Sequence, residues 1–244
     1  MKNKSFKWLR SLFLAIVLTT VTVAGLPLTG GPVTALAADK DIVVLYTNDV
    51  HCGVDDNIGY VMVFDFLGDA YEGFAEAIDA FKAANVSGMI IDLRNNGGGL
   101  VDTCVKMADL ILPEGVVVSM KDKNGNVTEK KIDDEYYDVP MVVLVNGYSA
   151  SASEIFSGAV QDYGIGEIVG MTTYGKGVVQ QLMDLGDGTC LKMTIAEYYT
   201  PNGRSINGKG VEPDVEVEYE YDENNPEADT QLEKALEVVK DQNK

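Results

Sequence analysis

The sequence predicts an α/β domain with parallel strand pairing in its first half. From Ile58 onward, short segments rich in β-branched and aromatic residues alternate with segments whose apolar residues have helical spacing. Buried strands also run directly into glycine-rich or serine-rich loops that are followed by helices, the place where such folds carry active sites. The 244 residues suffice for one domain with a real core and hardly for two.

The first half alternates between strands and helices. Phe74, Ile78 and Phe81 recur at helical spacing, whereas the flanking apolar runs are short enough for buried strands. We expect a strand at 58–66, a helix at 71–85, a strand at 88–93, a loop at 95–99 and a helix at 100–112.

The second half contains two predicted hairpins. The Asn124-Gly125 turn joins the first pair of strands, and Gly-Asp-Gly at 186–188 joins the second pair. We expect strands at 115–122, 127–132, 141–146, 167–171, 178–186, 189–199 and 211–221, a helix from Ser151 to about Tyr163, and an amphipathic helix after Glu227. Acidic alternate residues make the strand at 211–221 an edge strand or a strand with one buried face. The predicted core covers 58–225, and 226–244 form a C-terminal helix or tail.

Residues 1–37 have the pattern of a secretory signal peptide. A basic start precedes an apolar run at 12–26, and Ala35-Leu36-Ala37 provides small residues for cleavage. The alternative is an uncleaved anchor helix, although the apolar run is short for a bilayer span. We therefore expect an exported protein, outside the cell or in the cell envelope on the periplasmic side of the membrane.

The composition narrows the range of partners. A formal net charge of −19 argues against nucleic acid and against anionic membrane surfaces. The three cysteines, Cys52, Cys104 and Cys190, form no Cys-x-x-Cys pair. We expect buried free thiols at Cys104 and Cys190, and a disulfide or a metal role is the alternative.

Three serines at alternate positions follow the buried strand at 141–146. Ser151 and Glu154 match the Ser-x-x-Glu capping box that opens many helices. The alternative interpretation makes one serine a nucleophile. A serine at a helix N-terminus lies among unpaired N–H groups that can stabilise an oxyanion, and the loop at 95–99 offers more such groups. That loop is equally explained as a tight turn that needs glycine.

A nucleophilic serine needs a base, and the sequence offers few. His51 is the only histidine and lies a hundred residues before the serines, so a Ser-His-Asp triad is not expected. A lysine can take the proton when burial keeps it uncharged. Lys176, between two glycines and ahead of a β-branched run, is the candidate, and an exposed Gly-Lys-Gly turn is its alternative.

Four motifs, "DLRNNGGG", "SASASEI", "GKGVVQ" and "TPNGRSINGKGVEPDV", together resemble the C-terminal processing peptidases, or tail-specific proteases. They occur in the family's order and cover about Ile58 to Val217. The resemblance implies a ClpP/crotonase-like serine protease core without a cofactor or metal, and protein or peptide substrates with apolar C-termini. Whether the chain forms a homo-oligomer is left open. By motif position, the resemblance assigns the nucleophile to Ser151, the general base to Lys176, the lysine-orienting amide to Gln180, an acidic support to Asp162, and the oxyanion N–H groups to Gly98, Gly97 and Ala152.

The segment before Ile58 departs from that family. There is no room between Ala38 and Ile58 for the helical region and peptide-binding PDZ domain that usually precede the core. Residues 41–60 instead resemble the start of the 5′-nucleotidase family, where Asp49 and His51 would be metal ligands. Without a second histidine such a dinuclear site stays incomplete. We expect residues 38–57 to pack loosely or to add only an incidental strand. We interpret the sequence as a chimera, and a divergent N-terminus is the alternative.

Two other classes of function compete with a peptidase. The same fold resembles repeats of a retinoid-binding protein, so a non-catalytic protein that binds apolar ligands or peptides is one alternative. An inactive chimeric fragment, or a fragment of a metallophosphoesterase, is the other. The presence of Ser151, Lys176 and Gln180 in one chain favours the peptidase.

Overall fold

The computed structural model describes residues 57–220, 225 and 228–242, together with the backbone of three earlier strands. Those strands are β1 (Leu36–Ala38), β2 (Ile42–Tyr46) and β3 (Val50–Asp55). The remaining elements are β4 (Ile58–Val63), α2 (Ala70–Ala84), β5 (Gly88–Asp92), α3 (Val101–Asp109), β6 (Gly115–Asp122), β7 (Val127–Ile132), β8 (Met141–Val145), α4 (Ala152–Tyr163), β9 (Gly166–Gly170), β10 (Val178–Asp184), β11 (Cys190–Tyr199), β12 (Val215–Glu216) and α5 (Thr230–Asp241).

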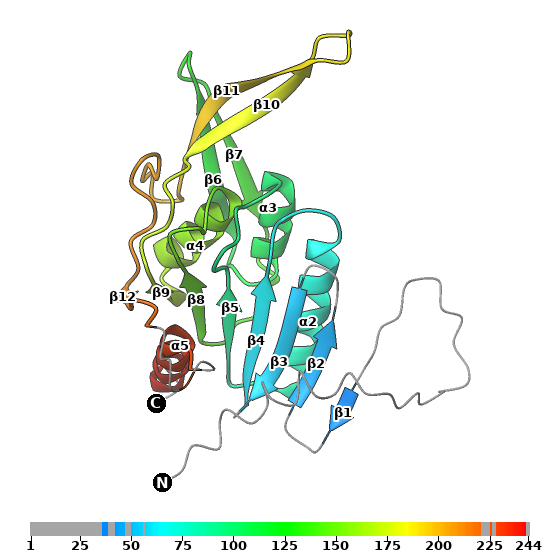
Figure 1. The fold of residues 1–244 in the computed structure, drawn as a ribbon, viewed down its shortest axis with the longest axis vertical. Coiled ribbons are helices and arrows are strands. Elements are labelled where there is room, and N and C mark those ends of the chain that lie inside the picture. Colours follow the sequence, from blue (N-terminus) through cyan, green and yellow to red (C-terminus); the bar gives the residue numbers. More distant parts are fainter. Residues whose placement is uncertain are drawn as a thin grey trace, which may run out of the picture.

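The main sheet confirms the predicted α/β fold with parallel pairing. Its strand order is β1-β2-β3-β4-β5-β8-β9-β12, and the pairs from β4 to β12 are parallel. Successive parallel strands require crossovers, and α2 and α4 provide two of them (Figure 1). The carboxyl ends of β5 and β8 therefore lie side by side. This brings the loop at 95–99 (the glycine loop) and the serines at 149, 151 and 153 (the serine cluster) to one edge of the sheet.

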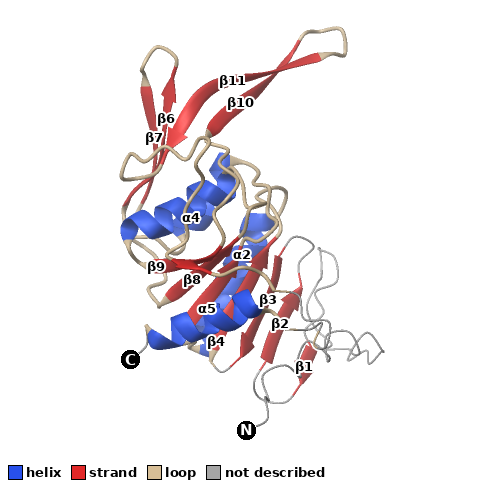
Figure 2. Cartoon of the chain, turned by 60° about the vertical axis from the view of Figure 1, so that its left-hand side comes forward, coloured by secondary structure: helices blue, strands red, loops and turns tan. Residues whose placement is uncertain are grey.

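Side chains of β5 and β8 alternate between the two faces of the sheet, and this alternation builds two apolar layers. Met89, Ile91 and Val143 belong to a large core with α2, α3 and α4. Ile90 and Val142 face the other way, into a smaller cluster that contains Ala235 and Val239 of α5. Figure 2 shows α5 on one face of the sheet and α2 on the other, so both faces of the parallel strands are covered.

A second sheet, in the order β10-β11-β6-β7, projects from this body (Figure 1). β11 pairs with β6 through Ala196–Tyr199, so the earlier part of β11 extends past β6 with β10 alone beside it. Cys104 is a buried free thiol, as predicted. The prediction for Cys190 was wrong: its thiol is free but exposed, because it lies near the tip of the projecting hairpin.

Two other expectations need correction. The strand predicted at 211–221 is reduced to β12, which pairs with β9 at Val215 and Glu216, although it does lie at the sheet edge. Pro213 cannot donate to a strand ladder, which accounts for the late start. Residues before Ile58 provide more than an incidental strand, because β3 pairs with β4 from Val50 to Asp55 and β2 pairs with β3.

Some predictions fall on residues outside the described part of the chain. The signal peptide at 1–37 lies almost wholly there, as does Asp49, and the side chains of Cys52 and His51 are not described. These hypotheses stay predictions. None of the helices in the described ranges combines the length and apolar character needed to span a bilayer.

Candidate functional site

The turn between β8 and α4 holds Ser151 in an unusual backbone conformation. Ser151 is the N-cap of α4, with φ 59° and ψ −111°, a region that side-chain-bearing residues rarely adopt. Such a conformation costs about 1–3 kcal/mol and persists where its surroundings impose it, typically at functional sites. The predicted placement of Ser151 at a helix N-terminus is confirmed.

The three alternating serines have different environments. Ser149 and Ser153 are fully buried, and their hydroxyls donate to the carbonyl oxygens of Leu93 (2.7 Å) and Asn96 (2.9 Å). Ser149 also accepts the N–H of Asn146 at 3.0 Å. Ser151 is only half-buried. The outer two serines therefore fasten the turn to the loop after β5, and the middle one is the serine that a substrate can reach.

The loop after β5 lies directly against this turn. Ala150 donates its N–H to the carbonyl oxygen of Asn96 at 3.0 Å, and the buried Asn96 amide donates to Val63 O at 2.8 Å. Gly98 has φ 99°, and its N–H donates to Asn96 Oδ1 at 2.8 Å. In the described part of the chain, no hydrogen bond uses the N–H of Gly97 or Ala152 as donor. Of the three predicted oxyanion donors, the N–H groups of Gly97 and Ala152 are thus free to bond a substrate oxygen within the described residues. The N–H of Gly98 is already bonded to Asn96.

Gly98→Ala should remove activity, whereas Gly97→Ala should not. A Cβ at Gly98 would lie 2.6 Å from Ala150 O and 2.8 Å from Ser151 Cβ, and alanine disfavours its positive φ. A Cβ at Gly97 meets nothing within 4 Å. We expect Gly98→Ala to lower kcat about 100-fold or more, because a shift of about 1 Å at the serine costs that much. Equal kinetics of the two variants would contradict this account of the loop.

Glu154 joins the serine turn to the segment that contains Lys176. Its carboxylate is fully buried in α4. Oε2 accepts the N–H of Ser151 at 2.7 Å and the N–H of Lys176 at 2.9 Å. Oε1 accepts the Thr173 hydroxyl at 2.7 Å and the Gly175 N–H at 2.6 Å. Because one oxygen binds both backbones, Ser151 and Lys176 are neighbours in space.

The side chains of Lys176 and Gln180 are less constrained than their backbones. Lys176 is half-buried, and its amine donates to no group among the described residues. Gln180 is an exposed residue of β10, paired with Thr194 just after a register shift. The roles predicted for Lys176 as general base and for Gln180 as the group that orients it thus stay predictions, while the neighbouring backbones of Ser151 and Lys176 are a finding.

Tyr198 is a member of the site that the sequence did not identify. Its ring is 2% exposed, and its hydroxyl donates to the carbonyl oxygen of Lys176. Burial raises the pKa of Tyr198 well above its usual range, and a hydrogen bond with the Ser151 side chain opposes that rise. The phenol is therefore neutral and contacts both halves of the site. A tyrosine in a strand gives no signal of this role, because the contact depends on how β11 lies against the segment of Lys176 and Gly177.

Tyr198→Phe should lower kcat about tenfold and leave the fold intact. The ring still fills its place, while the hydroxyl contacts with Lys176 and Ser151 are lost, at about 1 kcal/mol per hydrogen bond. Tyr199→Phe is the matched control, because the Tyr199 hydroxyl contacts only Glu197 Oε2, at 3.2 Å, among the described residues. Steady-state kinetics and thermal unfolding distinguish the two. Unchanged kcat in Tyr198→Phe would remove Tyr198 from the site.

Asp162 lies near the opposite end of α4 from Ser151. Its carboxylate pairs with Arg204 and accepts the N–H of Asn202 at 2.7 Å. It thereby holds the polar loop at 200–210, and that loop in turn contacts the lysine segment, because Gly208 donates to Gly175 O at 2.8 Å. Asp162 is thus linked to the lysine segment through this loop, and its role as an acidic support stays a prediction.

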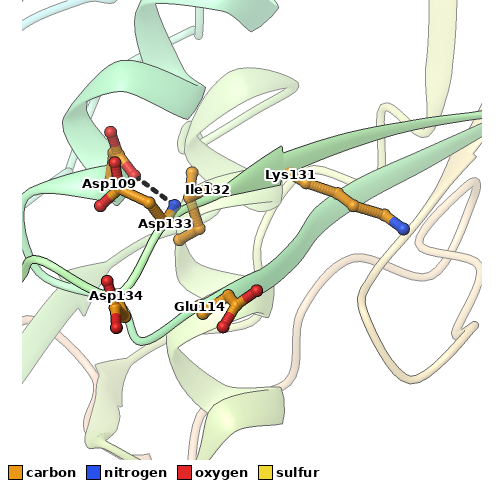
Figure 3. Close-up of a pocket in the computed structure, with 6 residues that line it drawn as sticks. All are labelled: Asp109, Glu114, Lys131, Ile132, Asp133 and Asp134. Carbon is orange, nitrogen blue, oxygen red and sulfur yellow. Dashed lines mark hydrogen bonds between the residues drawn. The ribbon is translucent and has the colours of Figure 1, made fainter.

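A pocket of about 490 Å³ lies elsewhere, where α3 ends and β6 and β7 meet (Figure 3). Four acidic residues, one lysine and one isoleucine line it, and Asp133 donates its N–H to Asp109 Oδ1 at 3.1 Å. It shares no residue with the serine turn or the glycine loop. None of its lining residues is a serine, cysteine or threonine, and none has a positive φ, so the serine turn is the candidate site.

Comparison with known proteins agrees with this geometry. A carboxy-terminal-processing protease of Bartonella bacilliformis is 38% identical over 172 residues, which make up 68% of this chain and 40% of that protein. A carboxyl-terminal-processing protease of Synechocystis sp. is 37% identical over 187 residues, 75% of this chain and 44% of the relative. A solved photosystem II D1 C-terminal processing protease has a TM-score of 0.63 at 36% identity, covering 75% of this chain and 45% of that one.

More distant structures share the fold. Mature CPAF complexed with lactacystin has a TM-score of 0.60 at 17% identity, covering 95% of this chain and 61% of that chain. The chain spans less than half the length of the two curated relatives. The family model of peptidase family S41 matches residues 57–217. With the family model covering most of its length, the chain belongs to peptidase family S41.

Proposed function

We propose that the chain is a serine endopeptidase that cleaves exported proteins near their C-terminus. The observation that carries the proposal is the Glu154 carboxylate, which holds the backbones of Ser151 and Lys176 on one oxygen. A nucleophile and a base must lie within reach of each other, and here two residues far apart in sequence are held together. The relatives named as carboxyl-terminal-processing proteases support the reaction class and the protein substrate.

In the proposed acyl transfer, each residue of the site has a distinct role. The Ser151 hydroxyl attacks the scissile carbonyl carbon while the Lys176 amine takes its proton, and Gln180 orients that amine. The developing oxyanion accepts hydrogen bonds from the N–H groups of Ala152 and Gly97. Lys176 then gives its proton to the departing amine of the C-terminal fragment. Water releases the acyl group from Ser151 by the same steps in reverse order.

We propose apolar C-terminal tails of exported, unfolded chains as substrates, since an extended chain can reach the half-buried Ser151, and β10 is an edge strand of its sheet. The net charge of −19 disfavours nucleic acid as a partner.

The test uses a covalent probe and a protein substrate. Purified chain is treated with a fluorophosphonate, which reacts with activated serines, and the adduct is located by peptide mass spectrometry. We expect one adduct at Ser151, together with cleavage of casein and of peptides ending in Ala-Ala that a chelator does not inhibit. A folded chain that neither cleaves these substrates nor takes the label would refute the proposal. Cleavage with the label on another residue would refute the assignment of Ser151.

A further inference from the structure

Arg94 is a nearly buried cation between the last helix and the loop that faces Ser151. Its side chain is 9% exposed, and it contacts two carboxylates, Asp92 at 0% and Asp229 at 23% exposure. Nε donates to both oxygens of Asp92 at 3.0 Å, and Nη2 donates to Asp92 Oδ2 at 2.6 Å. On the other side, Nη1 donates to Asp229 Oδ1 at 2.9 Å, and Nη2 lies 2.8 Å from Asp229 Oδ2. The planar guanidinium thus bridges β5 and the start of α5.

Helix α5 packs on the sheet in a position where its first turn and its N-cap contact Arg94. Ala235 and Val239 pack on the face of the sheet that also carries Ile90. Asp229 is the N-cap of α5 and accepts the N–H of Leu232 at 3.0 Å, so the carboxylate that holds Arg94 also fixes the first turn of the helix. Gln231, 1% exposed, accepts from Arg94 Nη1 at 3.3 Å and donates to Val217 O at 2.8 Å. Docking of α5 therefore sets where the guanidinium lies.

The backbone that follows Arg94 leads directly to the serine turn. Asn95 has φ 62°, a conformation that needs outside support in a residue with a side chain. Its N–H donates to Asn146 Oδ1 at 3.0 Å, and Asn146 Nδ2 donates back to Asn95 Oδ1 at 3.0 Å. Asn96 then accepts the N–H of Ala150. A displacement of Arg94 would thus reach Gly97 and Ser151 within a few bonds.

We propose that α5 is a positioning element of the serine site, which acts by holding Arg94 through Asp229 and Gln231. Arg94 in turn fixes the Asn95–Gly98 loop against the serine turn. The inference rests on the proposed function for its kinetic consequence, although the structural coupling stands apart from it. Neither Asp229 nor Gln231 contacts the reacting groups, so both act through another residue.

The deciding variant is Asp229→Ser. Serine is a good N-cap, so α5 keeps its capped start, but Arg94 loses the second carboxylate. Glu233→Ser is the matched control, because it removes a carboxylate from the same first turn at an exposed position. We expect Asp229→Ser to lower kcat roughly tenfold, as loss of positioning does, with KM within about twofold. Glu233→Ser should match the wild type, and Asp229→Asn, which keeps one acceptor for Arg94, should recover part of the loss.

Amide hydrogen exchange supplies a readout that does not need activity. The N–H groups of Asn95, Asn96 and Gly98 are bonded within the loop and its neighbours. They should exchange several-fold faster in Asp229→Ser than in Glu233→Ser, while the amides of α5 stay protected in both. Wild-type exchange in this loop would overturn the inference. A loss of α5 protection with an unchanged loop would do the same, because α5 would then serve the fold alone.

The two proposals can fail separately. If the wild type cleaves and labels at Ser151 while Asp229→Ser equals the control in kcat and loop exchange, only the role of α5 is refuted. If the wild type shows neither cleavage nor label, the proposed function is refuted, and loop exchange still decides whether α5 holds the loop.

Discussion

Replacing Ser151 with alanine should reduce proteolysis by about 10⁴-fold or more, because no other group can form the acyl intermediate. Lys176→Ala should cause a loss of the same order, since the serine then has no base. The two losses should not add in the double variant, because nucleophile and base act as one unit. Initial rates on casein and on peptides ending in Ala-Ala measure the effect, and thermal unfolding should show each variant folded.

The chain provides its own control for the lysine. Lys209 lies between Gly208 and Gly210, so it repeats the Gly-Lys-Gly sequence around Lys176 and is exposed. Lys209→Ala should therefore retain wild-type rates. If Ser151→Ala cleaves as fast as the wild type, the nucleophile lies elsewhere. If Lys209→Ala loses as much activity as Lys176→Ala, the role of Lys176 as base is not specific.

Glu154→Gln should lower kcat by about 100-fold or more and should also destabilise the fold. The carboxylate accepts four hydrogen bonds, two on each oxygen, and an amide can accept on one oxygen only. Whichever way the amide turns, its NH₂ group faces donors. Each buried donor left unsatisfied costs about 1–3 kcal/mol, so the segments of Ser151 and Lys176 should move apart.

The control for Glu154 removes a negative charge from an exposed helix face. Glu76→Gln on α2 does so, and it should change neither kcat nor the midpoint of thermal unfolding. Activity and the midpoint are measured for both variants. A Glu154→Gln enzyme with wild-type kcat would show that the shared oxygen is not needed to hold the two backbones together.

Much of the fold could be predicted because local pattern and burial agree. The helical spacing of Phe74, Ile78 and Phe81 matches α2, and the apolar runs at 88–93 and 141–146 match β5 and β8. The strand predicted at 211–221 failed because alternation alone could not show that β9 offers a partner only near Val215. The prediction that Cys190 is buried failed for a related reason, since the extension of a hairpin past its sheet depends on tertiary pairing.

The parts of the site that depend on residues close together in sequence could be predicted. The Ser151–Glu154 spacing indicated a capping box, and the Glu154 side chain does accept the Ser151 N–H. The same spacing could not reveal that Glu154 also holds Lys176, because that contact forms only once β9 returns the chain to α4. The roles of Tyr198 and of the Arg94–Asp229 pair could not be predicted for the same reason, since each contact joins segments that are distant in sequence.

The positive φ of Ser151 has a consequence for how such a chain evolves. Glycine adopts that conformation freely, whereas another residue gives up about 1–3 kcal/mol there. A lineage in which cleavage no longer matters would thus gain stability by drifting to glycine at the very position of the nucleophile. Once made, that change would resist reversal, because serine could return only against the stability gained. A serine at this position therefore costs the fold stability that glycine would supply.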